Sequence, residues 1–328
     1  MSIDLLTSQP LIPSTPSGAA PPSSRTVAAL ASPRRLADVL LRVWYPIGPE
    51  LGRSLRGHTL FIALILLYVL AELYLPALIG VETPFLPTFS FGFFLTMSGI
   101  TLAVPACLYV IYVMVAVRPQ ALVAYLADAV RRFLTVRRIC AALPVILLFP
   151  FFGSAFAYFR ILLPNFQPFA WDPAFAEWDR ALHGGYDAWQ LLQPVLGHPL
   201  VTAAVNGFYH LWFVVMFGVI LWQAGSLARP RVRMQFFLSF ILLWAVLGNL
   251  TAILLPSAGP VFYDRVTGLS NPFQPLMDYL HAANEVVPVM ALNVQEQLWA
   301  SYVEHGLATL GGITAMPSMH VATSLCFA

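Results

Sequence analysis

The sequence contains little charge and no lysine. Only 10% of its 328 residues are charged, whereas 59% are hydrophobic. A soluble domain carries about 25% charged residues, so the composition excludes an ordinary soluble protein and indicates a membrane protein with several spans. All 17 basic residues are arginine. A GC-rich bacterial genome explains the missing lysine more simply than a functional requirement does.

Metal-binding patterns are also missing. The three cysteines, Cys107, Cys140 and Cys326, lie in apolar segments without CxxC or Cys/His spacing, which is typical of packing residues. The histidines outside the apolar segments show no spacing of metal ligands either. We therefore expect no metal and no cofactor. The formal net charge of +2 gives no indication of a nucleic-acid partner, and the oligomeric state cannot be derived from the sequence.

Long apolar segments predict an all-α, polytopic transmembrane helical bundle. A helix that crosses a bilayer needs about 20 apolar residues. Five segments meet this requirement, and a sixth begins near residue 316 and is interrupted by the end of the chain at Ala328. The five segments are 59–79, 91–117, 139–160, 201–222 and 235–256.

The chain divides into three predicted parts. Residues 1–33 are rich in Ser, Pro, Thr and Ala, which indicates a disordered tail. Residues 34–58 interleave arginines with apolar side chains, a pattern typical of a segment lying on anionic lipid. Residues 59–328 form the transmembrane domain. Within it, residues 119–136 have apolar positions at helical spacing and predict a further helix on the membrane surface.

The arginines predict the orientation, because cytoplasmic loops are enriched in basic residues. Fourteen arginines lie in the N-terminal segment and in the loops 118–138 and 223–234. We therefore expect a bacterial inner-membrane protein with a cytoplasmic N-terminus. Two long loops, 161–200 and 257–315, then face the extracytoplasmic side. Short helices are predicted in both: two within 161–200, starting with Asp172 as N-cap before Pro173 and ending the first at Gly184-Gly185, and two more near 274–286 and 290–306.

The most informative motif, Ala315-Met-Pro-Ser-Met-His320, lies where the second loop meets the sixth apolar segment. A helix N-terminus offers unpaired N–H groups that bind anions, and Pro317 suits the first helical turn. Ser318 adds a hydroxyl group, and His320 adds a group that exchanges a proton near neutral pH. These residues are suited to phosphoryl transfer. The alternative is that Pro-Ser-x-His only starts a helix.

This motif resembles the second signature of the membrane-bound type-2 phosphatidic acid phosphatase superfamily. It is similar to the branch that contains inositol phosphorylceramide synthases and their bacterial relatives. Three softer segments are similar to the same branch: Trp178–Gly184, Tyr209–Trp212 and Pro256–Tyr263. The resemblance implies that His320 protonates the leaving alkoxide as the catalytic acid, and that Ser318 contacts the phosphate.

The third signature of that family is not found after His320. It is a His-x-x-x-Asp pair whose histidine attacks phosphorus. Two further spans would place such a pair on the order of 40 residues downstream, and only eight residues follow His320. We therefore expect this chain to be a fragment, inactive by itself, and the longer reading frame to supply the pair.

Other residues are candidates for the same site. Tyr263 and Arg265 are candidate phosphate-binding residues, with Arg265 as a clamp. For Arg265 a partner role for Asp264 or a contact with a lipid headgroup is an equal alternative, and Arg160 is a weaker candidate. His210, Tyr209, Asn206 and Asn249 are candidates for lining a cavity that admits the lipid headgroup. For His210 a structural hydrogen bond is the alternative.

The sequence thus predicts phosphoryl transfer on lipid phosphate esters, with membrane lipids as partners, a phosphohistidine intermediate and an extracytoplasmic site. Whether water or an alcohol accepts the phosphoryl group stays open, and with it the choice between phosphatase and transferase. The alternatives are a transporter or a non-catalytic relative. Few ionisable residues within the spans, Glu72 and His210 among them, argue against an ion-coupled transporter.

Overall fold

The computed structural model describes residues 33–81, 87–303 and 312–327, and it contains two compact units, 1–48 and 49–328. The described part of the first unit is helical and opens helix α2 (Pro33–Gly57). No strand occurs in the described ranges, which confirms the all-α prediction. The tail predicted for 1–33 lies almost wholly outside these ranges, and the three-part domain division stays a prediction.

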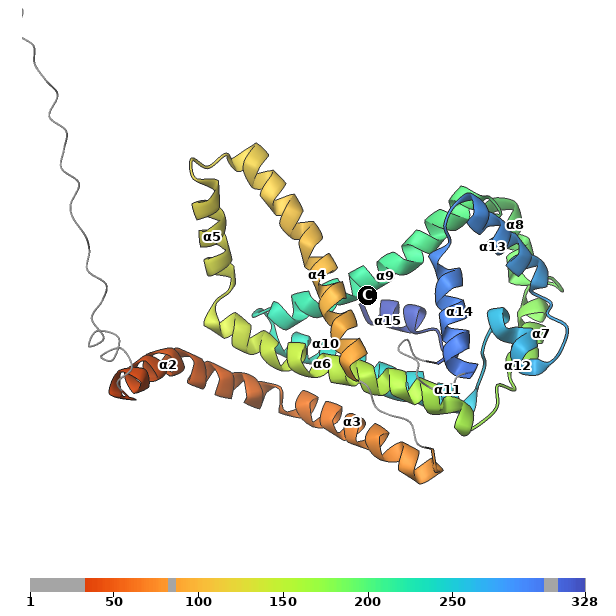
Figure 1. Ribbon diagram of the computed structural model, residues 1–328, viewed down its shortest axis with the longest axis horizontal. Coiled ribbons are helices and arrows are strands. Elements are labelled where there is room, and N and C mark those ends of the chain that lie inside the picture. Colours follow the sequence, from red (N-terminus) through yellow and green to blue (C-terminus); the bar gives the residue numbers. More distant parts are fainter. Residues whose placement is uncertain (1–32, 82–86, 304–311, 328) are drawn as a thin grey trace, which may run out of the picture. The chain divides into compact units, whose positions relative to one another are not determined.

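Five helical segments are long and apolar enough to cross a membrane, by length and composition. They confirm the five predicted spans and have the architecture of a polytopic helical membrane protein (Figure 1). Three contain more than one helical type. The segments are α3 (Thr59–Ile79); Ser90–Val117, within α4 (Pro87–Tyr112) and the π-helix η1 (Val113–Val117); Val136–Asn165, with α6 (Val136–Leu162) and the 3₁₀ turn η2 (Leu163–Asn165); α9 (Pro199–Gly225); and Pro230–Leu254, with α10 (Pro230–Leu242), the π-helix η3 (Leu243–Leu250) and α11 (Thr251–Leu254).

Shorter helices connect these spans. The predicted surface helix is α5 (Leu122–Phe133), which buries none of its residues. The predicted loop helices are present as α7 (Asp172–Leu182), α8 (Ala188–Leu196), α13 (Gln274–Val286) and α14 (Met290–Val303). The structure adds the 3₁₀ turn η4 (Pro260–Phe262) and α12 (Tyr263–Thr267). Helix α15 (Met319–Phe327) occupies the start of the predicted sixth span, whose full extent stays a prediction.

Helix α6 is the central helix of the bundle. Helices α3, α4 and α9 pack against it, and 61% of its apolar stretch is buried, against 6% for the span that contains α4. The core consists largely of phenylalanines, with Phe61, Phe152 and Phe237 fully buried. Many large apolar side chains on the other helix faces are exposed, as expected of surfaces that contact lipid.

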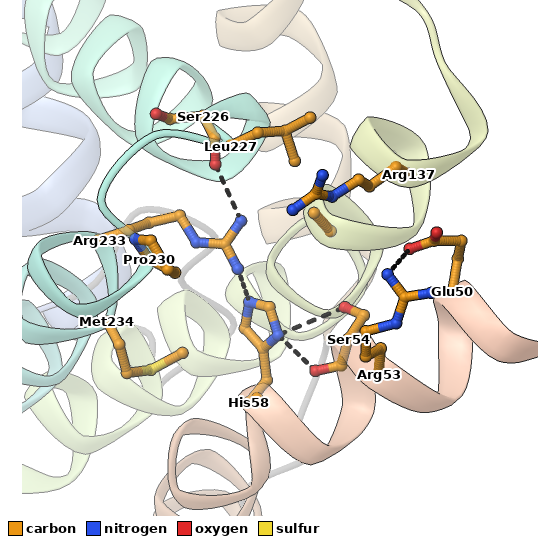
Figure 2. Close-up of a pocket in the computed structure, with 12 residues that line it drawn as sticks. Glu50, Arg53, Ser54, His58, Arg137, Ser226, Leu227, Pro230, Arg233 and Met234 are labelled. Atoms are coloured by element: carbon orange, nitrogen blue, oxygen red, sulfur yellow. Dashed lines mark hydrogen bonds and ion pairs between the residues drawn. The ribbon is translucent and has the colours of Figure 1, made fainter.

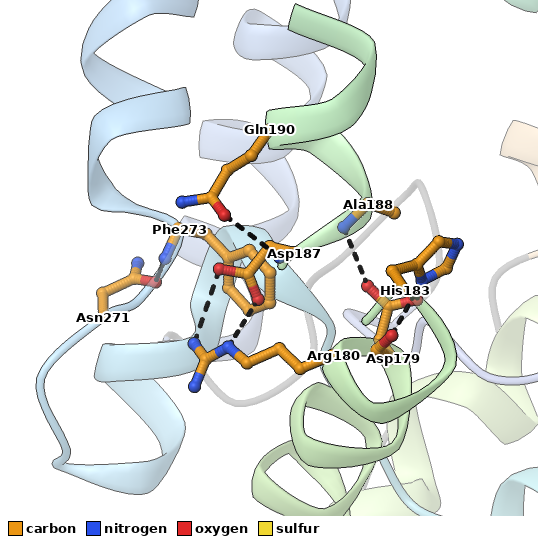
Figure 3. A network of polar contacts seen from close by, with 8 residues as sticks. All are labelled: Asp179, Arg180, His183, Asp187, Ala188, Gln190, Asn271 and Phe273. Atoms are coloured by element: carbon orange, nitrogen blue, oxygen red, sulfur yellow. Dashed lines mark hydrogen bonds and ion pairs between the residues drawn. The ribbon is translucent and has the colours of Figure 1, made fainter. Parts of the chain in front are cut away.

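The segment Trp178–Gly184, one of the family-like stretches, contributes to a polar network that joins α7 to α8 (Figure 3). The Arg180 guanidinium donates from Nε to Asp187 at 2.8 Å, and the Asp187 side chain belongs to a capping box with Gln190 at the start of α8. The Ala188 N–H donates to the Asp179 carboxylate at 3.4 Å. Because these bonds satisfy helix ends, the polar residues of this segment position the two helices of the first long loop.

Candidate functional site

Ser318 stands directly before helix α15 and caps it. Its hydroxyl accepts a hydrogen bond from the Val321 N–H at 3.4 Å, and its carbonyl accepts one from the Ala322 N–H at 3.1 Å. The helix begins at Met319, so Pro317 precedes it by two residues and does not lie in the first turn as expected. The segment is therefore a helix start, and the hydroxyl and the first N–H groups of α15 converge on the same place.

His320 lies in the first turn of α15 against aromatic side chains of α9. Its ring stacks on Tyr209 with a centroid distance of 4.3 Å and an angle of 18°, and it lies 4.1 Å from the ring of Trp212. Within the described part of the chain, its Nε2 atom is buried and has no hydrogen-bond partner. Burying an imidazole nitrogen without a partner costs free energy. A catalytic role is one of the explanations for such an unpaired group.

Three of the predicted cavity residues lie on α9, and one of them, Tyr209, contacts His320. The Tyr209 ring also contacts the His210 ring, at a centroid distance of 5.5 Å. His210 Nδ1 lies 2.8 Å from the carbonyl of Asn206, one turn earlier. The Asn206 side chain accepts a hydrogen bond from the Ala291 N–H at 3.2 Å. The contact between His210 Nδ1 and the Asn206 carbonyl is the structural hydrogen bond considered for His210, and it does not involve the His210 Nε2 atom.

Two tryptophans fix helix α15. Trp212 Nε1 donates to the Ser324 hydroxyl at 3.2 Å, and Trp244 Nε1 donates to the fully buried Thr323 at 3.0 Å. Trp244 belongs to the π-helix η3, a rare element that often occurs at functional sites and that the apolar pattern does not reveal. Gly248 of the same element lies close to Met319: a Cβ there would be 3.2 Å from the Met319 sulfur.

The turn Pro256–Pro260 supports the residues before the motif. The Ala315 N–H donates to the Ser257 carbonyl at 2.8 Å, and a Cβ at Gly259 would lie 2.7 Å from the Cβ of Ala315. Gly259 also has a φ of 82°, which favours glycine. The motif is therefore held from one side by backbone contacts with this family-like segment.

Asp172 organises this turn, a role that its sequence position did not suggest. Trp171, rather than Asp172, occupies the N-cap position of α7. The buried Asp172 carboxylate instead accepts hydrogen bonds from the Ser257 hydroxyl at 2.7 Å, the Ala258 N–H at 3.0 Å and the Gly259 N–H at 2.7 Å. A short polar residue before proline is a normal helix start, so the sequence alone indicated only the local role.

Gly312 lies against the backbone of α6. A Cβ at this position would overlap the backbone carbonyl group of Arg160. This close approach places Gly312 beside the C-terminal end of the third span, and only glycine fits there. The adjacent Ile313 is buried in a cluster with Phe159 and Ala258, so the segment before the motif is packed on two sides.

Gly312→Ala is accordingly expected to displace the segment before the motif. The new methyl group must push the chain away from α6, which typically costs about 1–3 kcal/mol. We expect a lower unfolding temperature in detergent. Gly99→Ala in α4, where a Cβ meets nothing within 4 Å, is the matched control. Equal unfolding temperatures for the two variants would contradict the close approach.

Arg160, the weaker of the two arginine candidates, is buried at this point. Its side chain is 6% exposed, its guanidinium lies 5.0 Å from the Phe156 ring, and its Nε atom has no hydrogen-bond partner within the described residues. Asn249, expected near His210, instead donates to the Tyr68 hydroxyl at 2.5 Å. Glu72, one of the few ionisable residues within the spans, is buried, with one carboxylate oxygen unpaired in the described ranges. Buried polar side chains thus lie inside the bundle, and the backbone of one of them, Arg160, contacts the segment before the motif.

Arg265 and Tyr263 lie in other contacts. Arg265 forms a two-pronged ion pair with Glu296, at 3.0 and 3.5 Å, and its guanidinium lies 5.0 Å from the Trp299 ring. Its partner is therefore Glu296 rather than Asp264. Tyr263 is buried against Phe273. Within the described part of the chain, neither residue forms a hydrogen bond or ion pair with Ser318 or His320, so their phosphate-binding role stays a prediction.

The geometry defines a class of site. A capped helix start, a buried imidazole nitrogen and aromatic walls converge at the side of a helical membrane bundle, an arrangement suited to holding an anionic group next to a proton donor. In the described ranges no group of three or more His, Cys, Asp or Glu side chains could hold a metal ion.

Comparison with known proteins agrees with the class. A sequence model of the PAP2 superfamily matches residues 173–328, which include all of α7 except its first residue, α9, the turn 256–260 and the whole motif. No curated protein and no solved structure matches the chain. The similarity supports phosphoryl transfer on lipid phosphates as the activity of this part of the chain.

Proposed function

We propose that this protein catalyses phosphoryl transfer on lipid phosphate esters, with His320 as the catalytic acid. The observation that carries the proposal is the placement of the His320 imidazole. Its Nε2 atom is buried beside the capped start of α15 without a partner in the described residues, inside the region similar to the PAP2 superfamily. An acid at this position can protonate the alkoxide that leaves when the P–O ester bond breaks.

The remaining residues have supporting roles in this proposal. Ser318 and the first N–H groups of α15 hold the phosphoryl oxygens, where negative charge is stabilised during transfer. Arg160 is a buried cation whose backbone contacts Gly312, in the segment before the motif. Arg265 and Tyr263 are also proposed as phosphate contacts. Arg265 would first have to leave Glu296, to which it is bound.

The chemistry requires a nucleophile besides His320. In the proposed route a second histidine, from a His-x-x-x-Asp pair, attacks phosphorus while the ester oxygen leaves with the proton of His320. Water or an alcohol then attacks the phosphohistidine and returns the proton. No such pair follows His320 in this sequence, so we expect the 328-residue chain to show no turnover by itself.

The finer assignments belong to the same proposal. The arginine distribution supports a site on the extracytoplasmic face of a bacterial inner membrane. The motif and the Tyr209–Trp212 segment support the inositol phosphorylceramide synthase-like branch, with a sphingolipid or phospholipid headgroup entering sideways from the bilayer. The exposed apolar residues on the helix faces, Phe208 and Leu211 near the site among them, are suited to a lipid substrate.

The proposal predicts a measurable activity that depends on Ser318. The protein carrying the third signature, in liposomes with a phosphatidic acid or phosphatidylinositol donor, should either release phosphate or transfer a headgroup to an added alcohol. Ser318→Ala should lower either activity by about tenfold or more, because it removes a hydroxyl contact to a charged phosphate. Ser270→Ala, an exposed serine in the second loop, is the control. Full activity of Ser318→Ala would contradict the phosphate contact.

The second candidate function is that of a non-catalytic relative. Such a protein would bind the lipid phosphate without turnover even in its longer reading frame, and the same liposome assay decides between the two.

A further inference from the structure

A second polar site lies at the other end of the bundle. The pocket has a volume of about 210 Å³ and is lined by residues from α2, α6 and the α9–α10 connection (Figure 2). Its residue Ser226 directly follows α9 and lies 14 residues beyond Trp212 at the His320 site, a separation of roughly 20 Å at the rise of a helix. The two sites therefore share no residues.

Arg233 of α10 is the central side chain of the pocket. It is 7% exposed, and its guanidinium donates to the carbonyls of Ala224 and Ser226, at 3.4 and 3.2 Å. These carbonyls end α9 and supply only partial negative charge. The Arg233 Nε atom is buried without a partner in the described residues. A buried guanidinium with an unused donor is incompletely satisfied by the protein.

His58 adds no negative charge to this arrangement. Its Nε2 atom lies 2.8 Å from Arg233 Nη2, and its Nδ1 atom lies 2.7 Å from the Ser54 carbonyl. Since the guanidinium has only donors and the carbonyl only accepts, Nδ1 carries the proton and the ring is neutral. Burial lowers the pKa of His58, and the hydrogen bond to Ser54 and the charge of Arg233 act in opposite directions on it. The ring orients Arg233 and leaves its charge unbalanced.

The other charges around the pocket are also mostly positive. Figure 2 shows the side chains of Arg53 and Arg137 entering from α2 and α6, together with that of Glu50. Glu50 is bound to Arg53 at 3.1 Å. In the described part of the chain, no carboxylate lies within ion-pair distance of Arg137 or Arg233. Two guanidinium groups from different helices thus share one pocket without a counter-charge.

We propose that this pocket is a binding site for a phosphate-class anion, held by Arg233 and Arg137, with the Ser54 hydroxyl beside it. Planar guanidinium forks match the oxygens of a phosphate group and bind it strongly. The site is separate from the phosphoryl-transfer site and does not depend on that function. The pocket lies where two predicted spans meet at the water-facing end of the bundle, so both a phospholipid headgroup and free inorganic phosphate can reach it.

Binding is tested on the purified 328-residue chain with two probes. Inorganic phosphate is titrated at constant ionic strength, with chloride as the comparison, and binding is followed by the unfolding temperature. In parallel, the chain is placed in nanodiscs of phosphatidylglycerol or phosphatidylcholine, and retained lipid is measured by native mass spectrometry. A response to phosphate identifies a soluble anion, and retention of phosphatidylglycerol alone identifies a headgroup; each supports the site.

Variants place the response in this pocket. Arg137→Gln removes an exposed guanidinium and should weaken the responding probe by about tenfold or more, as expected for a charge-assisted contact. Arg131→Gln, an exposed arginine of α5 outside the pocket, should leave it unchanged. Arg233→Lys keeps the positive charge but removes the planar guanidinium. Its response to the probe should lie between those of Arg137→Gln and Arg131→Gln.

The opposite results overturn the proposal. These are no response to either probe, equal losses in Arg137→Gln and Arg131→Gln, or a response that disappears in Ser318→Ala while Arg137→Gln retains it. The last result would assign the anion to the His320 site. It would leave the proposed function intact, so the two proposals fail separately.

Discussion

Replacing His320 with alanine is expected to lower phosphoryl transfer by a factor of about 10²–10⁴, the usual contribution of a positioned general acid. The leaving alkoxide would then depart without a proton. The effect should appear in the maximal rate more than in substrate affinity, because the proton is needed in the transition state. Phosphate release or headgroup transfer in liposomes, from the protein that carries the third signature, measures it.

Two controls separate chemistry from packing. The His320 ring stacks on Tyr209 and lies beside Trp212, so alanine also removes an aromatic contact. His320→Phe restores the ring without the nitrogen and should be as inactive as alanine, with an unfolding temperature nearer to that of the unchanged protein. His281→Ala, an exposed histidine of α13, should retain activity. Turnover in His320→Phe close to that of the unchanged protein would remove His320 from the mechanism.

The fold could be predicted where one physical rule dominates. A bilayer span needs about 20 apolar residues, so the five spans could be located from the sequence, with ends within five residues of those in the structure. Gly184 and Gly185, with φ values of 67° and 94°, end α7 as predicted. Such local signals are contained in a few neighbouring residues.

The site could be predicted only in part, because its geometry depends on contacts between distant residues. Tyr209 and His210 could be placed on α9, but the stacking of Tyr209 on His320 joins positions more than 100 residues apart. Asn249 was expected near His210, but its side chain forms a hydrogen bond with Tyr68 of α3. No local pattern in the sequence indicates that contact. The π-helix η3, which brings Trp244 to Thr323, also has no signature in the apolar pattern.

Asp172 also acts through contacts with distant residues, and its replacement should have the largest effect on stability. Its carboxylate accepts three hydrogen bonds from residues 257–259, and these three residues are buried. Asp172→Ala leaves three buried donors unsatisfied, at about 1–3 kcal/mol each. We expect a loss of stability of about 3 kcal/mol or more, which lowers the unfolding temperature by on the order of 5–10 °C.

Turnover should fall together with stability, because the turn supports the motif. The Ser257 carbonyl accepts the Ala315 N–H at 2.8 Å, so a displaced turn moves the residues that lead to Ser318 and His320. A misplacement of about 1 Å can cost about 10²-fold in rate. Measured below its own unfolding temperature, Asp172→Ala should therefore lose roughly that factor.

Asp172→Asn separates the carboxylate from its volume. The amide oxygen can replace Oδ1, which accepts from Ser257 and Gly259, but the NH₂ group then faces the Ala258 N–H, which Oδ2 accepts. Asparagine should therefore be intermediate in both unfolding temperature and rate. Asp264→Asn, an exposed carboxylate on α12, should change stability by less than about 0.5 kcal/mol. Equal unfolding temperatures and rates for Asp172→Asn and Asp264→Asn would contradict this role of the Asp172 carboxylate. The turn would then be held by its own backbone, and only the packing of Ile313 against Ala258 would connect it to the motif.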